Sequence, residues 1–194
     1  MLGVVLCGGQ STRMGSDKGL LKLNNETWVQ TAFNKINSFR LPVVISVNKE
    51  QYKDYSSIFL LENLITDDDS LQIRGALSGV LSVHLKYPDE DLLLLACDMP
   101  LLGTELVDEL LTVYDQYLSY DAFIYTKAGE PEPLCGIYKA KALAGIYQLY
   151  KLNQLAKYSM KYMLEQITTH TTPLPDNKKE FFRNFNTHAE INGL

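Results

Sequence analysis

The stretch Leu6-Cys7-Gly8-Gly9-Gln10-Ser11-Thr12-Arg13-Met14-Gly15-Ser16-Asp17-Lys18 follows an apolar run that begins at Leu2. A short apolar run that ends in a glycine-rich loop is typical of a buried strand that leads into a ligand-binding turn. Gly8 and Gly9 lack a Cβ, so their backbone N–H groups can approach an anion or a flat base closely. Arg13 provides a planar fork for phosphate oxygens, and Lys18 provides a mobile positive charge. An ordinary strand-to-helix turn with solvated Arg and Lys side chains would share these features.

Two common nucleotide-binding loops do not fit this stretch. A dinucleotide-binding GxGxxG loop that opens at Gly8 needs further glycines where this chain has Gln10 and Arg13. A P-loop needs Gly-Lys followed by Ser or Thr, whereas Lys18 lies between Asp17 and Gly19. The loop therefore belongs to neither of these classes.

Short apolar runs alternate with longer amphipathic ones along the rest of the chain, which indicates a parallel sheet covered by helices. We expect strands at 2–7, 42–47, 64–66, 91–96, 121–126, 133–138 and 167–172, the pair 121–126 and 133–138 forming a hairpin. We expect helices at 26–39, 75–87, 103–117, 140–150, 157–166 and 187–194, with Thr104 as an N-cap. The predicted fold is a three-layer α/β/α domain with a mostly parallel, Rossmann-like sheet. Residues 1–194 form one domain in this interpretation, and the family resemblance given below implies a nucleotide-binding half at 1–100 and an acceptor-side half at 101–194.

Composition excludes several classes of protein. The chain has 194 residues, 46 % of them hydrophobic and 21 % charged, and a net charge of −5, so neither disorder nor a nucleic-acid-binding polycation is expected. The charge is unevenly distributed, because residues 139–194 hold eight basic and four acidic side chains. The three cysteines show no metal-binding spacing, and no secretory or membrane segment is expected, which predicts a cytoplasmic protein.

A second motif, Cys97-Asp98-Met99-Pro100, follows the most apolar stretch of the chain. A buried strand of this kind delivers Asp98 to the carboxyl end of the sheet, where open α/β sheets bind ligands. A carboxylate placed there is costly unless a cation meets it, and Mg²⁺ prefers one or two carboxylates together with phosphate oxygens. Asp98 is thus a candidate metal ligand, with a turn or capping residue next to Pro100 as the alternative.

Both motifs resemble those of a known family. The first stretch is similar to the LAGGxSxRMGxDK signature of nucleotidyltransferases with the nucleotide-diphospho-sugar transferase fold, with Cys7 in place of the usual Ala. It looks most like the MobA family of molybdopterin-guanine dinucleotide synthases, whose CDxP motif the second stretch resembles. The resemblance extends in patches over nearly the whole chain. It implies Mg²⁺-dependent transfer of GMP from GTP to the terminal phosphate of molybdopterin, with release of pyrophosphate.

The resemblance also implies roles for individual residues. Asn184-Phe185-Asn186-Thr187 is similar to the family's NxNTPEE signature, and Ser46 and Asn48 correspond to an Asn-x-Asn near the base. In the acidic run that follows Thr66, Asp67 is the first match for the carboxylate that holds guanine, and Asp68 is the second. The implied catalytic residues are Arg13, Lys18, Asp98 and Asn186. The implied nucleotide-binding residues are Leu6, Cys7, Gly8, Gly9, Lys18, Ser46, Asp67 and Asp98, and the implied metal ligand is Asp98.

The acceptor side departs from the family pattern. Gln154-Leu155-Ala156-Lys157-Tyr158 stands where relatives carry a Gly-Glu/Asp-Arg segment, so Lys157 would supply the cation without a bidentate fork. The basic residues Lys151, Lys157 and Lys161 suggest electrostatic steering of an anionic pterin. Two other functions remain open: a CTP-using cytidylyltransferase or another small nucleotidyltransferase, and a non-catalytic nucleotide-binding partner of molybdoenzymes. The expected partners are GTP, molybdopterin and, transiently, molybdoenzymes or cofactor-assembly proteins, with no nucleic acid and no membrane.

Overall fold

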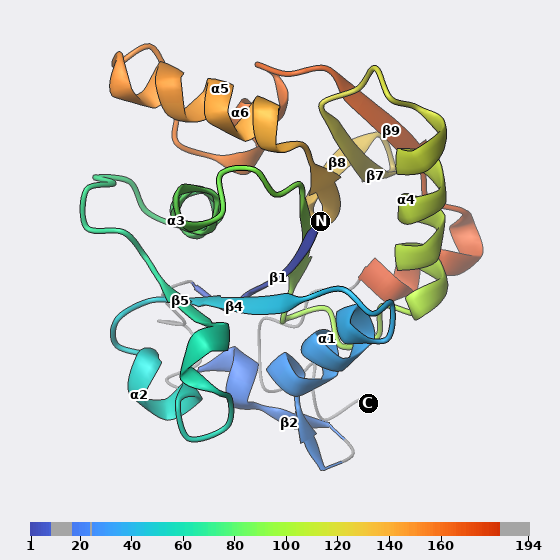
Figure 1. Cartoon of the computed structure of the whole chain (residues 1–194). Helices are drawn as coiled ribbons and strands as arrows, with labels where there is room; N and C mark the ends of the chain where they lie inside the picture. Colours follow the sequence, from blue (N-terminus) through green and yellow to red (C-terminus); the bar gives the residue numbers. More distant parts are fainter. Residues whose placement is uncertain (9–16, 24, 183–194) are drawn as a thin grey trace.

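The core of the structure, a computed structural model that describes residues 1–8, 17–23 and 25–182, is a seven-stranded sheet (Figure 1). Its strands are β1 (Leu2–Leu6), β4 (Val43–Val47), β5 (Leu64–Thr66), β6 (Leu92–Ala96), β7 (Ala122–Lys127), β8 (Glu130–Tyr138) and β9 (Thr169–Pro173). They lie in the order β5-β4-β1-β6-β8-β7-β9. β8 runs antiparallel to both of its neighbours, and the remaining neighbouring pairs are parallel. The mostly parallel sheet is as predicted.

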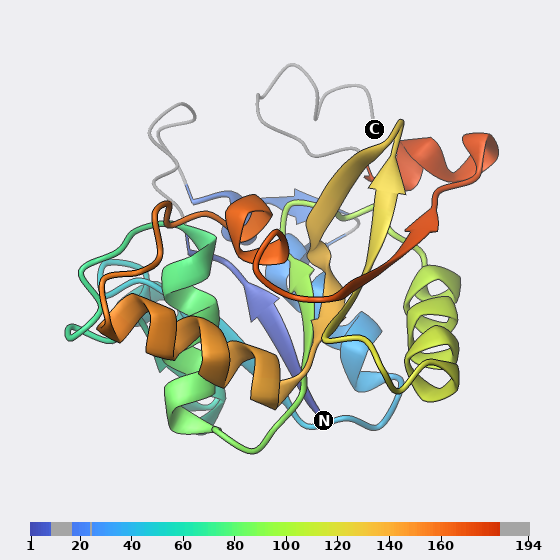
Figure 2. The same cartoon turned by 90° about the horizontal axis from the view of Figure 1, so that it is seen from above.

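Helices cover both faces of this sheet (Figures 1 and 2). The helices α1 (Trp28–Asn37) and α4 (Thr104–Gln116) pack on one face. The helices α3 (Ala76–Lys86), α5 (Ala140–Lys151) and α6 (Met160–Leu164) pack on the other. Shorter elements are β2 (Lys22–Leu23), β3 (Glu26–Thr27), α2 (Tyr52–Tyr55) and 3₁₀ turns at Lys18–Leu20, Leu61–Asn63 and Asp176–Phe182. The three-layer α/β/α arrangement is confirmed.

The central strands are apolar throughout because both of their faces are covered. In β1, Val5 packs with the layer of α1 and α4, and its neighbour Val4 packs with the layer of α3 and α5. Leu93 and Leu94 of β6 divide between the two layers in the same way. All four side chains are at most 1 % exposed, which explains why these runs show no alternation of polar and apolar residues.

Several predicted boundaries were wrong. The helix expected from residue 26 begins at Trp28, because Glu26–Thr27 pairs with Lys22–Leu23 and Thr27 then forms a capping box with Gln30. The helix expected at 157–166 is limited to Met160–Leu164. The helix predicted at 187–194 lies outside the described residues.

The prediction that Thr104 caps α4 was also wrong. Gly103 occupies the N-cap position with extended backbone, and Thr104 is the first helical residue. A side chain at position 103 would collide with the carboxylate of Glu105, which folds back over the start of the helix. The space beside the cap is therefore already taken.

The order of the strands creates a crevice at the carboxyl end of β1. The chain leaves β1 for β4 on one side, whereas β6 lies on the other side of β1. Ligands of open α/β sheets bind where connections diverge in this way. The loop after Leu6 and the turn that contains Asp98 both begin at this crevice.

Within the described ranges, no helix is both long enough and apolar enough to cross a membrane.

Candidate functional site

The two sequence motifs meet at the carboxyl ends of β1 and β6. Nζ of Lys18 lies 3.7 Å from Oδ2 of Asp98, and each side chain is only about one-fifth exposed. Strand pairing brings the starts of the two motifs together, because Leu6, the first residue of the first motif, is in register with Ala96, which directly precedes the second motif. An ammonium group and a carboxylate are thus held side by side at the crevice.

The environment of Asp98 disfavours its charged form in the absence of a cation. Burial raises the pKa of Asp98 above its ordinary value, and the nearby Lys18 offsets only part of this effect. The second carboxylate oxygen, Oδ1, is buried and has no hydrogen-bond partner among the described residues. A buried polar atom without a partner is costly, so Oδ1 has the character of a ligand atom.

Lys35 forms a hydrogen bond with the backbone of the turn that contains Asp98. Nζ of Lys35, on α1, donates a 2.6 Å hydrogen bond to the carbonyl of Pro100. Burial lowers the pKa of Lys35 to about 8. This contact joins residues 65 positions apart in sequence, and it fixes the backbone immediately after Asp98.

Asp17 organises the end of the first loop. One of its carboxylate oxygens accepts hydrogen bonds from the backbone N–H of Gly19 (2.9 Å) and from the hydroxyl of Tyr55 (3.1 Å). The other accepts from Nε2 of Gln51 at 2.8 Å, and the same Nε2 donates to the carbonyl of Cys7 at 2.9 Å. Gln51 thus connects the residues on both sides of the loop, which positions Lys18.

A cavity of about 580 Å³ opens at the carboxyl ends of β1, β4 and β5, on the opposite side of β1 from β6, the strand that leads to Asp98. Its walls include Leu6, Gly8, Ser46 and Asn48, together with the loop 67–75 and the start of α3. Ser46 is buried and lies so close to Gly79 of α3 that a Cβ there would contact its hydroxyl. The volume falls within the range of about 300–1,000 Å³ that is usual for small-molecule sites.

The three aspartates among the acidic residues of the cavity wall have different environments. Oδ1 of Asp68 accepts a 2.8 Å hydrogen bond from the backbone N–H of Ser70, and hydrogen bonds from the side chain and the backbone of Ser70 lower the pKa of Asp68. Asp69 forms an exposed ion pair with Lys49 at 2.5 Å. Burial raises the pKa of Asp67, whose carboxylate has no hydrogen-bond or ion-pair partner among the described residues. Of these three aspartates, Asp67 is thus the one whose carboxylate is available to a ligand.

The structure brings together most of the predicted site residues that it describes. Leu6, Gly8, Ser46 and Asp67 line the cavity, and Lys18 and Asp98 form the ion pair. Cys7 is buried beside Cys97, and its carbonyl is engaged by Gln51. The predicted residues Gly9, Arg13 and Asn186, and the neighbouring Asn184, lie outside the described residues.

Two of the basic residues of the acceptor side have described contacts. Nζ of Lys157 lies 5.9 Å from the ring centroid of Tyr162, and Lys161 forms an exposed 2.8 Å ion pair with Glu130. Glu132, on β8, lies within electrostatic influence of Asp98, and burial raises its pKa. Strand β8 therefore places acidic groups next to a basic group of α6.

Sequence analysis missed several residues that shape the site. Asp17 carried a signal, because it is part of the first motif. Gln51, Tyr55 and Lys35 carried none, because each acts through a contact with a distant part of the chain. Arg74 also lines the cavity, and its guanidinium has no hydrogen-bond or ion-pair partner in the described part of the chain.

Family comparison agrees with this geometry. The sequence profile of the MobA-like NTP transferase domain matches residues 3–170, which include every described residue of the site. The chain belongs to this family of nucleotidyltransferases. The glycine-rich loop, Lys18 and Asp98 are accordingly parts of a nucleotidyltransferase domain.

Similar curated proteins cover different shares of the chain. A probable molybdenum cofactor guanylyltransferase from Geobacillus sp. is 30 % identical over 100 % of this chain and 97 % of its own length. A molybdenum cofactor biosynthesis bifunctional protein from Synechocystis sp. is 32 % identical over 74 % of this chain. The match spans only 40 % of that longer protein.

Solved structures share the fold. A molybdopterin-guanine dinucleotide biosynthesis protein A from Archaeoglobus fulgidus superposes with a TM-score of 0.77 at 21 % identity, covering 100 % of this chain and 96 % of that one. The bifunctional IspDF of Campylobacter jejuni superposes with a TM-score of 0.69 at 15 % identity, over 99 % of this chain and 53 % of its own. The α/β architecture of the sheet is thus that of known members of this fold.

Proposed function

We propose that this nucleotidyltransferase transfers GMP from GTP to the terminal phosphate of molybdopterin, giving molybdopterin guanine dinucleotide and pyrophosphate. Membership of the MobA-like family and the names of the relatives support this choice of substrates. The observation that carries the proposal is that the Lys18–Asp98 pair and a nucleotide-sized cavity lie at the same carboxyl edge of the sheet.

The cavity receives the guanosine part of GTP in this proposal. Asp67 accepts hydrogen bonds from N1–H and from the exocyclic amino group of guanine, which a carboxylate can do with both of its oxygens. Its carboxylate has no competing partner among the described residues, unlike those of Asp68 and Asp69. The backbone of Gly8 and the hydroxyl of Ser46 line the same cavity.

Asp98 is the residue that would hold Mg²⁺. Its buried, unpartnered Oδ1 fits a metal ion, and Mg²⁺ binds proteins through one or two carboxylates while phosphate oxygens and water complete its shell. When bound, Mg²⁺ neutralises charge on the phosphates and supports their orientation.

In this reaction the protein mainly orients the two substrates and stabilises their charges, and it forms no covalent intermediate with them. An oxygen of the acceptor phosphate forms a bond to the α-phosphorus of GTP while the bond from that phosphorus to the bridging oxygen of pyrophosphate breaks. The acceptor phosphate is already ionised near neutral pH, so no general base is required. The ammonium group of Lys18 lies where it can meet the negative charge of the departing pyrophosphate. Arg13 and Asn186 are proposed to contribute from the segments outside the described residues.

We also propose transient contacts with molybdoenzymes or cofactor-assembly proteins in the cytoplasm, because relatives are named for biosynthesis of the molybdenum cofactor.

Pyrophosphate release tests the proposed reaction. The purified protein is incubated with Mg²⁺, molybdopterin and one of GTP, CTP, ATP or UTP at a time, and a reaction without molybdopterin serves as the control. We expect release with GTP that depends on both molybdopterin and Mg²⁺. Release with CTP alone would reassign the base and support a cytidylyltransferase, whereas binding of nucleotide without release under any condition would support a non-catalytic module.

A further inference from the structure

The loop 67–75, which joins β5 to α3, forms one wall of the nucleotide cavity. Leu71 and Ile73 anchor it in the core, each 6 % exposed, while Ser70 and Gln72 lie at the surface. In Figures 1 and 2 this loop lies beside the C-terminal end of α5, an element that follows it by about 70 residues. The loop is thus in contact with a part of the chain that sequence analysis placed in the acceptor-side half.

Tyr150, in the last turn of α5, makes this contact through its hydroxyl group. Oη accepts a 2.8 Å hydrogen bond from the backbone N–H of Gln72 and donates one of 3.3 Å to the backbone carbonyl of Ser70. The hydroxyl therefore bridges two backbone groups of the exposed turn and attaches that turn to α5. Both partners are backbone atoms, so the contact fixes the path of the chain rather than any one side chain.

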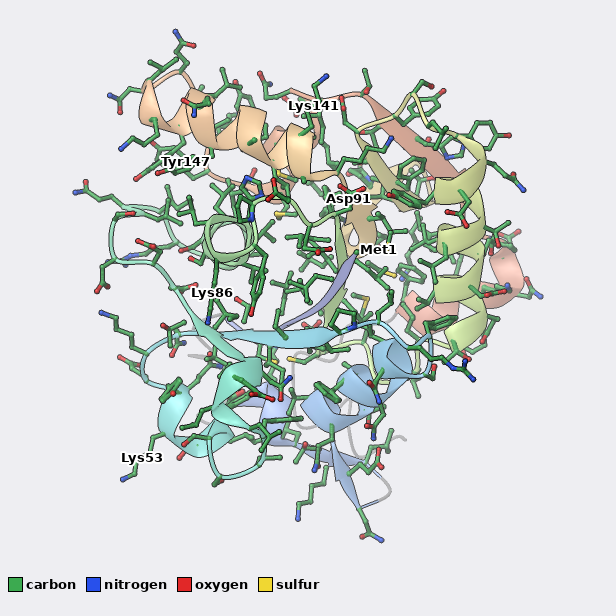
Figure 3. All side chains as sticks on the ribbon, in the orientation of Figure 1. Met1, Lys53, Lys86, Asp91, Lys141 and Tyr147 are labelled. Carbon is green, nitrogen blue, oxygen red and sulfur yellow. The ribbon has the colours of Figure 1, made fainter. Side chains whose placement is uncertain are left out.

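The ring of Tyr150 is itself fixed by aromatic neighbours. The ring of Tyr147 stacks on it with centroids 6.3 Å apart, and the ring of Tyr158 meets it edge-on at 5.9 Å. Figure 3 labels Tyr147 on α5, on the flank of that helix that faces α3. A hydroxyl on a ring held in this way loses little additional freedom when it hydrogen-bonds the loop.

The other described contacts of the exposed turn are weaker restraints on its position. Oδ1 of Asp68 and the backbone N–H of Ser70 belong to the same turn, so their hydrogen bond shapes the turn without attaching it to the rest of the molecule. The ion pair of Asp69 and Lys49 is exposed, and such pairs contribute little. The backbone N–H of Asp68 donates to Ser82 at the base of the loop rather than at its outer end.

We propose that Tyr150 is a positioning residue for the nucleotide: its hydroxyl holds the 67–75 loop in the conformation that forms the cavity wall. The inference rests on the proposed function only in placing a nucleotide in this cavity. Loss of the hydroxyl weakens nucleotide binding, because part of the population must first reorder the loop. Turnover of the bound nucleotide is unchanged, since Tyr150 does not touch the pair of Lys18 and Asp98.

The Tyr150→Phe variant tests this role, because it removes the hydroxyl and keeps the ring. A net hydrogen bond corresponds to about a 2- to 12-fold change in an equilibrium constant. We expect the KM and the Kd for the nucleotide to rise, by at most about this factor, with kcat within about twofold of wild type. Backbone amides of residues 69–72 should also exchange hydrogen faster in the nucleotide-free variant.

Tyr147→Phe is the matched control, because Tyr147 lies one turn earlier on the same helix and its hydroxyl makes no hydrogen bond in the described part of the chain. It should leave both KM and amide exchange unchanged. An unchanged Kd in Tyr150→Phe, an equal change in Tyr147→Phe, or a fall in kcat with constant KM would overturn the assignment.

The experiment uses whichever of the four nucleotides the wild type binds. If the wild type binds none, the proposed function is overturned, and the assignment of Tyr150 falls with it. If the wild type binds and Tyr150→Phe binds equally well, only the assignment of Tyr150 is overturned. Faster exchange at 69–72 together with weaker binding supports it, whatever the base.

Discussion

Nζ of Lys18 lies 3.7 Å from Oδ2 of Asp98, which joins two motifs that are 80 residues apart in the chain. Neither charge is fully solvated, since each side chain is about one-fifth exposed. The lysine compensates only part of the effect of burial, because the pKa of Asp98 remains raised. The negative charge of Asp98 is therefore only partly balanced by Lys18, and a further cation would stabilise its ionised form.

The first prediction concerns Asp98→Asn. Removing the carboxylate should lower kcat by about 100-fold or more, the size of effect seen when one electrostatic stabiliser of a transition state is lost. The metal-free variant should nevertheless be more stable than the wild type near neutral pH, because the raised pKa of Asp98 means that its ionised carboxylate is unfavourable in the folded protein even beside Lys18. An effect of about 1 kcal/mol corresponds to a rise of roughly 2–4 °C in Tm for a domain of this size.

The pH dependence of this stability difference has a defined sign. A carboxyl group whose pKa is raised by folding favours the folded state at low pH, and this contribution is lost as the pH rises through the raised pKa. The Tm advantage of Asp98→Asn should thus be absent near pH 4 and full at pH 7, measured by thermal unfolding in EDTA. Mg²⁺ with GTP should stabilise the wild type more than the variant. A variant that is less stable than the wild type at pH 7 would contradict the view that Asp98 is an uncompensated buried charge.

A second prediction concerns Lys18→Gln. Without the neighbouring ammonium group, the pKa of Asp98 should rise further, because the lysine is the main influence that lowers it. The titration of the Asp98 carboxyl in the metal-free protein, followed by NMR of the labelled side chain, should therefore have a higher midpoint in the variant than in the wild type. Lys18→Arg, which keeps the charge, should lie nearer to the wild type.

The location of this pair could be predicted from sequence, because the two strands that deliver it are apolar on both faces. A strand that is apolar on both faces is expected at the centre of a sheet covered by helices. The residues that show this pattern are Val4, Val5, Leu93 and Leu94. Once two parallel strands lie at the centre, the residues after them must meet at one edge. The chemistry of the residues, one glycine-rich loop and one isolated carboxylate, then indicated a phosphate and metal site.

The supporting contacts could not be predicted, because nothing in local sequence specifies them. Gln51 reaches Asp17 across 34 residues, and Lys35 reaches Pro100 across 65. Gln51 lies in a polar stretch without periodicity, and Lys35 occupies a helix position that elsewhere would be solvated. Such contacts depend on the packed arrangement of whole elements. The misplaced cap of α4 is instead a local error of one residue, because Gly103 takes the cap position and Glu105 fills the space beside it.

The acidic run after β5 gives a third prediction, which separates three neighbouring aspartates. Asp67→Asn should raise the KM for GTP by about 10-fold or more, because a site built to accept hydrogen bonds from guanine loses discrimination when the acceptor changes. Asp69→Asn is the control, since its carboxylate is exposed and paired with Lys49. It should change KM by less than about twofold. Steady-state kinetics with GTP and with ITP, which lacks the 2-amino group, distinguish the two variants.

The pattern across nucleotides identifies the contact. The wild type should prefer GTP to ITP, and Asp67→Asn should largely lose this preference. If Asp68→Asn instead removes the preference, the hydrogen bond that its carboxylate accepts from Ser70 must be broken on nucleotide binding, and Asp68 replaces Asp67 in the base contact.

Gly75 provides the fourth prediction, because its backbone has φ +82° and ψ −164° at the point where the cavity wall enters α3. This region is essentially accessible to glycine alone, and forcing another residue into it costs about 1–3 kcal/mol. A Cβ at this position would meet no atom within 4 Å, so any effect of Gly75→Ala arises from the backbone rather than from a collision. We expect a lower Tm together with weaker nucleotide binding, measured by thermal unfolding with and without GTP.

Gly145→Ala is the matched control for this substitution. Gly145 lies within α5, and a Cβ there would likewise meet no atom within 4 Å. Its backbone is helical, so replacement by alanine should stabilise the protein by about 0.5–1 kcal/mol and leave nucleotide binding unchanged. Opposite signs for the two glycines would establish that the conformation of Gly75 sets the shape of the cavity wall. An unchanged Tm and unchanged nucleotide binding in Gly75→Ala would instead mean that the loop forms the same cavity wall with a different backbone conformation at residue 75.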